Sequence, residues 1–164
     1  MKKILILIPL LALLFLGCGS DNSSSPNANT ETVSTVVWTN TVGRDEASLQ
    51  PIAQEELDAL SAGAFGEAWD LRTDEAKALM SREDYIRLNQ ECPKFSGFQF
   101  QIQKITINGN QAEVRVKIAG FNASYDFIYE NGQWRYDPPA DVKADYKLGI
   151  DQLVAKEKAA GNCS

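Results

Sequence analysis

The stretch QAEVRVKIAGFNASYDFIYENGQWRY, residues 111–136, decides the fold. From 112 to 118, apolar residues alternate with Glu113, Arg115 and Lys117, and from 123 to 129 apolar residues again take every second position. A period of two predicts strands that have one buried and one solvated face. Asn131-Gly132 predicts a two-residue hairpin turn. We therefore expect antiparallel strands near 112–118, 123–130 and 133–136.

A fourth strand is expected just before this stretch. Phe98, Phe100 and Ile102 alternate with glutamines, but Ile105 and Ile107 follow in the opposite phase. Because a slip of one residue turns every later side chain to the other face, we expect a bulge near residues 103–104. The turn at 108–110 then joins this strand to the next, and prolines at 138 and 139 end the sheet. The result is a curved, four-stranded meander.

Helices are expected on both sides of the sheet in the sequence. Apolar residues recur at spacings of three and four between 50 and 92, which predicts helices near 52–62, 64–71 and 74–80. Ser81 and Asp84 fit a capping box for a further helix that Pro93 stops. A last helix is expected after Asp141, although Gly149 weakens it. Helices followed by antiparallel strands indicate an α+β fold with a C-terminal helix.

The helical motifs carry a resemblance. LSAGAFGEAWDL (60–71) and EAKALMSREDY (75–85) resemble the helical opening of small secreted bacterial domains of the nuclear transport factor two-like, or cystatin-like, superfamily. The resemblance covers about residues 51–136. It implies a cone in which a curved sheet cradles the helices, often around a pocket. Some members of the superfamily are enzymes that use an Asp or His base together with tyrosine donors.

The first eighteen residues read as an export signal. Two lysines precede the apolar run 4–16, and Gly17-Cys18 closes it, as at a signal-peptide cleavage site. Phe15 to Cys18 resembles the lipobox of bacterial lipoproteins, which implies cleavage after Gly17 and diacylglycerol on the sulfur of Cys18. Gly19, where no aspartate stands, implies the outer membrane if the cell has two membranes. The other reading is an ordinary signal with a chance cysteine.

These features predict three segments: a signal peptide at 1–17, a lipid-anchored flexible linker at 18–49, and the α+β domain at 50–164. Residues 19–32 are almost wholly polar and too poor in apolar groups to fold. Residues 33–42 have high strand propensity, so they form either an added edge strand or an extended segment docked through Trp38. We expect docking on the chain's own domain.

Composition excludes several function classes. The whole chain carries a net charge of −6, and removal of Lys2 and Lys3 leaves 14 basic against 22 acidic residues, a net −8. This balance argues against binding of nucleic acid. The absence of histidine removes the usual general base and the commonest zinc ligand, so no metal and no cofactor is expected. With Cys18 lipidated, Cys92 and Cys163 are left, and outside the cytoplasm they are expected to form a disulfide; the alternative is a reactive thiol at Cys92.

Aromatic residues supply the candidate pocket, although the same side chains could simply be core. The candidates are Trp69, Phe100, Tyr125, Phe127, Tyr129 and Trp134. Only tyrosines among the ionisable residues fall in the apolar phase of the strands, so a catalytic base would have to come from a helix, such as Glu67, Asp70 or Asp84. Each of these acids reads more simply as a solvated residue or a cap, and no catalytic residue is assigned.

The sequence therefore favours a lipid-anchored protein of the cell envelope whose small domain is non-catalytic and serves binding or assembly. Its expected contacts are the membrane, through lipid on Cys18, and an envelope protein or a small apolar ligand. The alternative is a pocket protein or an isomerase-like enzyme that uses a helix carboxylate with Tyr125 or Tyr129. A closed interior would favour the first reading, and a pocket with a buried helix carboxylate facing one of these tyrosines would favour the second.

Overall fold

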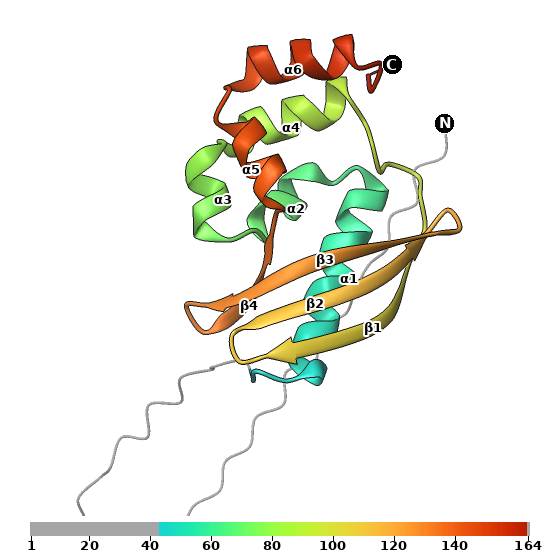
Figure 1. The fold of residues 1–164 in the computed structure, drawn as a ribbon, viewed down its shortest axis with the longest axis vertical. Helices are drawn as coiled ribbons and strands as arrows, with labels where there is room; N and C mark the ends of the chain where they lie inside the picture. Colours follow the sequence, from blue (N-terminus) through green and yellow to red (C-terminus); the bar gives the residue numbers. More distant parts are fainter. Residues whose placement is uncertain (1–42, 164) are drawn as a thin grey trace, which may run out of the picture. The chain divides into compact units, whose positions relative to one another are not determined.

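The computed structural model describes residues 43–163. The lipidation site Cys18, the cleavage site after Gly17 and the segment 33–42 lie outside the described residues. The described part is an α+β unit with a four-stranded antiparallel sheet, as predicted (Figure 1). No helix between residues 43 and 163 has the length and apolar character that a membrane span requires.

The sheet is a meander of order β1-β2-β3-β4. Its strands are β1 (Phe100–Asn108), β2 (Gln111–Ile118), β3 (Phe121–Glu130) and β4 (Gln133–Asp137). The register of β1 against β2 shifts between Ile102 and Lys104, which confirms the bulge predicted from the phase slip. Val114, Val116, Phe127 and Trp134 lie on the buried face, with exposures of 1% or less. The alternation of apolar and polar residues along the strands thus places one face of the sheet in the core.

The first helix, α1 (Glu46–Ala62), packs on this buried face and contacts β1 and β4. It begins earlier than the predicted 52, so the domain boundary at 49/50 is also too late. The reason is a capping box in which Asp45 accepts from the backbone of Ser48 and the Ser48 hydroxyl accepts from the backbone of Asp45. Pro51 lies inside the helix and not at its start.

Three short helices follow as predicted: α2 (Phe65–Asp70), α3 (Asp74–Leu79) and α4 (Arg82–Glu91). Thr73 caps α3, and Ser81 caps α4 by accepting from the backbone N–H of Asp84 at 3.1 Å. Gly63 ends α1 in the left-handed region, with φ of 72°, where glycine pays no steric cost. This turn separates α1 from α2, which packs against it.

The C-terminal segment forms two helices and not the single helix expected, α5 (Ala140–Tyr146) and α6 (Ile150–Ala159). Gly149 adopts φ of 79°, which breaks the helical path between them. α6 packs beside α4 (Figure 1). The predicted disulfide joins Cys92, just after α4, to Cys163, just after α6, so the end of the chain is fastened to the helical layer.

Candidate functional site

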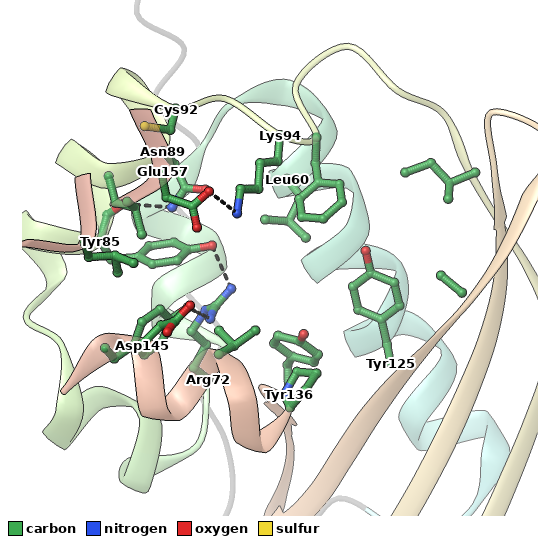
Figure 2. A pocket seen from close by; sticks show the side chains of 18 of the residues that line it. Leu60, Arg72, Tyr85, Asn89, Cys92, Lys94, Tyr125, Tyr136, Asp145 and Glu157 are labelled. Atoms are coloured by element: carbon green, nitrogen blue, oxygen red, sulfur yellow. Dashed lines mark hydrogen bonds and ion pairs between the residues drawn. The ribbon is translucent and has the colours of Figure 1, made fainter. Parts of the chain in front are cut away.

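A cavity of about 340 Å³ lies where α4, α5 and α6 meet β2 and β3 (Figure 2). Its volume falls in the range of pockets that take small organic molecules. The apolar part of its wall comprises Leu60, Leu88, Phe95, Ile118, Val142 and Leu153. Polar groups are fewer, and the innermost of them are Arg72 and four tyrosines, at 85, 125, 136 and 146. The arrangement is that of a binding pocket, mostly apolar with a few convergent polar groups.

Arg72 is held at the base of the cavity by the backbone on either side of it. The N–H of Thr73 donates to the carbonyl of Tyr136 at 3.0 Å, and the N–H of Tyr136 donates to the carbonyl of Leu71 at 2.9 Å. These bonds attach the segment after α2 to β4 and turn the Arg72 side chain inward, where it is 5% exposed. A guanidinium at this depth requires partners from the surrounding elements.

Those partners are mainly tyrosines. Nη1 of Arg72 donates to the hydroxyl of Tyr146 at 2.8 Å, and Nη2 donates to the hydroxyl of Tyr85 at 2.6 Å. The guanidinium carbon also lies 4.1 Å from the ring centre of Tyr85 and 5.1 Å from that of Tyr136, so both rings face the cation. Nε of Arg72 is buried with no hydrogen-bond partner among the described residues.

Glu56 is the acidic partner of Arg72. It lies on the inner face of α1, fully buried, with Oε1 at 3.6 Å from Nη2 of Arg72. That distance is too long for a hydrogen bond, and neither carboxylate oxygen has a hydrogen-bond partner within residues 43–163. Burial raises the pKa of Glu56 to about 7, and the nearby guanidinium only partly offsets this rise. Loss of hydration therefore outweighs the attraction to Arg72.

Two tyrosine hydroxyls in the cavity have no partner in the described part of the chain, those of Tyr125 and Tyr136. Figure 2 shows the ring of Tyr125 rising from the sheet into the space opposite Tyr85 and Lys94. Burial raises the pKa of Tyr125 to about 12 and raises that of Tyr136 as well. Both phenols therefore keep their protons at neutral pH and can donate to a carbonyl or carboxylate oxygen placed between them.

The rim of the cavity is closed by contacts from the end of the chain. Nζ of Lys94 pairs with Oε2 of Glu157 at 2.8 Å (Figure 2). The side chain of Asn162 donates to the same carboxylate at 2.7 Å. The Cys92–Cys163 disulfide lies next to this rim, because Cys92 itself lines the cavity. The residues after β4 therefore form a wall of the pocket.

The six predicted pocket aromatics are divided by the structure. Tyr125 lines the cavity, and Phe100 stands behind it, with its ring centre 6.1 Å from that of Tyr125. Phe127, Tyr129 and Trp134 lie farther along the sheet in the core. Trp134 is covered by α1, and its Nε1 donates to Ser48 on that helix at 3.2 Å.

Trp69, the sixth of these aromatics, packs at the periphery, and its Nε1 donates to the carbonyl of Met80 at 3.1 Å. Along the strands, residues that line the cavity and residues that lie in the core belong to the same apolar phase. Whether a given strand residue lines the cavity or lies in the core therefore depends on which helices pack above it.

The two charged groups of the site, Glu56 and Arg72, were missed by the reading of the sequence. Glu56 could have been noticed, because it lies in the apolar stripe of Ala53, Leu57 and Leu60 at helical spacing. Arg72 stands in a short connection and carries no such signal. The acids named as candidates lie elsewhere: Glu67 and Asp70 are exposed, and Asp70 pairs with Arg82 at 3.4 Å. Within residues 43–163, no group of acidic or cysteine side chains is arranged to hold a metal ion.

Comparison with known proteins gives likeness of fold at low identity. No family model matches the chain, and no curated protein matches it. A nuclear transport factor two-like protein of unknown function from Burkholderia xenovorans is 19% identical, with a TM-score of 0.41, over 59% of this chain and 88% of its own.

A SEC-C motif containing protein from Rhodopseudomonas palustris is 14% identical, with a TM-score of 0.41, over 56% of this chain and 77% of its own. A candidate ketosteroid isomerase from Kribbella flavida is 20% identical, with a TM-score of 0.37, over 57% and 80%.

Proposed function

We propose that the protein is a lipid-anchored lipoprotein of the cell envelope whose nuclear transport factor two-like domain binds a small, largely apolar molecule. The observation that supports binding is the pair of unpartnered hydroxyls, on Tyr125 and Tyr136, inside a mostly apolar cavity. Buried polar groups are normally hydrogen-bonded, so donors left free in a pocket suit a ligand acceptor. The signal and Cys18 supply the anchor in this proposal.

The ligand class follows from the chemistry of the walls. Its body is apolar, because the wall is mostly aliphatic and aromatic. One end carries a carbonyl or an anionic oxygen, because the free donors are phenols and the nearest cation is Arg72. A cationic end is disfavoured there, since Arg72 would repel it at short range. Binding thus takes precedence over assembly as the role of this domain.

The test uses 1-anilinonaphthalene-8-sulfonate, a fluorescent probe with an apolar body and an anionic end. We expect saturable binding that Tyr125→Phe and Tyr136→Phe each weaken about fivefold, the value of one neutral hydrogen bond. Ala123→Trp should abolish binding, because Ala123 lines the cavity and the indole would fill it. Tyr129→Phe is the matched control, because Tyr129 is buried but does not line this cavity. Equal effects of all three Tyr→Phe changes would contradict the proposal.

A second candidate function is isomerase-like proton transfer, and Glu56 is the observation that favours it. The pKa of Glu56, about 7, suits a general base, and its negative charge contributes to the raised pKa of Tyr125. Glu56 does not itself line the cavity, however, so a bound molecule would touch Arg72 and the tyrosines and not the carboxylate. Isomerisation of a β,γ-unsaturated ketone, followed by ultraviolet absorbance and abolished by Glu56→Gln, would establish this alternative over simple binding.

A further inference from the structure

One end of the sheet exposes two large aromatic side chains. Phe121, just after the β2–β3 turn, is 75% exposed, and Phe98, just before β1, is 43% exposed. Ile118 pairs with both Phe100 and Phe121 in the sheet, so Phe98 and Phe121 lie at the same end. Exposed apolar groups gathered at one place on a domain commonly mark a surface that another apolar phase covers.

This aromatic end is continuous with the pocket. Phe121, Ala123 and Tyr125 take alternate positions of β3 and therefore face the same side of the sheet. Ala123 and Tyr125 line the cavity, whereas Phe121 extends beyond the cover of the helices. Lys94 and Ser124, two exposed residues of the cavity wall, also belong to this end. A row of apolar side chains thus runs from the outer surface into the binding site.

The charge of this region is opposite to that of the rest of the chain. The segments that form this end, residues 94–101 and 117–124, contain two basic side chains, Lys94 and Lys117, and no acid. Lys94 is paired with Glu157 of α6, so Lys117 is the cation that stands unpaired among the described residues of these segments. With Glu157 included, the net charge of this end is +1, against −8 for the chain without its signal. Basic residues beside exposed aromatics suit the interface of a bilayer that contains anionic lipid.

We propose that the end formed by Phe98 and Phe121 docks on the surface of a lipid bilayer, so that the pocket takes its ligand, a membrane-resident amphiphile, directly from the membrane. This rests on the proposed binding function. The 24 residues between Cys18 and Gly43 reach at most about 80 Å even when fully extended, so an anchor at Cys18 would hold the domain near the membrane. Because such a tether raises the effective concentration of the domain at the membrane, a weak contact with the bilayer is enough to keep it docked.

The docking test replaces the lipid with a tether that does not depend on processing at Cys18. The chain from Gly19 onward, which has no histidine of its own, is attached by an N-terminal hexahistidine tag to nickel-chelating vesicles of phosphatidylethanolamine and phosphatidylglycerol. Tryptophan is placed at the tip by Phe121→Trp, and at the opposite end of the sheet by Asn110→Trp as control. Brominated acyl chains should quench the tip tryptophan and leave the control at the background of the unsubstituted protein.

Equal quenching at the two positions would overturn the proposal, as would a concentration-dependent dimer that protects the tip tryptophan without vesicles. Phe121→Ser should lower the vesicle partition coefficient about tenfold, because an exposed phenyl ring loses its apolar contact. It should also slow transfer of dansylaminoundecanoic acid from vesicles to the protein, and leave 1-anilinonaphthalene-8-sulfonate binding from solution unchanged. Failure of that probe to bind the parent protein would instead refute the proposed function.

Discussion

Glu56 predicts an unusual dependence of stability on pH. Its pKa is about 7 in the folded protein and about 4.5 in the unfolded chain, so between these values the folded state holds a proton that the unfolded state has lost. The free energy of unfolding therefore falls as pH rises through this window. The loss between pH 5 and pH 8 is on the order of 2–3 kcal/mol by proton linkage. No histidine titrates in the same range, since the chain has none.

Glu56→Gln should remove this dependence, because a neutral amide resembles the protonated acid at every pH. The variant should match the parent near pH 4.5 and exceed its stability by about 3 kcal/mol at pH 8.5. Urea denaturation followed by tryptophan fluorescence measures both. Glu55→Gln, an exposed neighbour on the same helix, is the control and should keep the parent's pH dependence. A Glu56→Gln protein less stable than the parent at pH 8.5 would refute the reasoning, because it would show that Arg72 more than offsets the burial of the carboxylate.

Three further predictions concern the anchor, the disulfide and the core. Cys18→Ala should leave the protein without lipid and released from membranes in fractionated cells; continued membrane association would count against the anchor. Reduction of the disulfide, whose cysteines are 71 residues apart, should lower the free energy of unfolding by about 4 kcal/mol, and two free thiols in the native protein by mass spectrometry would exclude the bond. Phe127→Ala should cost about 4 kcal/mol, whereas Ile128→Ala on the opposite face should cost under about 1.5 kcal/mol; equal losses would contradict the assigned register.

The sheet could be predicted from the sequence because its signals are local. The alternation from 112 to 118 indicates which side chains of β2 face the core. The Asn131-Gly132 turn indicates that β3 and β4 pair antiparallel. The phase slip before Ile105 located the bulge for the same reason. The start of α1 was placed near residue 52, too late in the chain, because the capping signal of Asp45 and Ser48 was not recognised.

The site could be predicted only in part, because it is made of contacts between distant segments. Glu56 and Arg72 are buried together by the packing of α1 against the segment after α2. No sequence pattern near either residue indicates that the two are paired. Tyr85 and Tyr146 join them from α4 and α5, and only the folded chain brings their hydroxyls to one guanidinium. Tyr125 was predictable because its phase on β3 directs it inward.

The measurement that tests the central claim most directly is an amide chemical-shift titration of the protein with 1-anilinonaphthalene-8-sulfonate. If the cavity is the binding site, the largest shifts will fall on its walls, at residues 88–95, 123–125 and 142–146. The same titration of Ala123→Trp should leave these amides unmoved. Saturating shifts confined to surfaces away from the cavity, or unchanged binding in Ala123→Trp, would contradict the account.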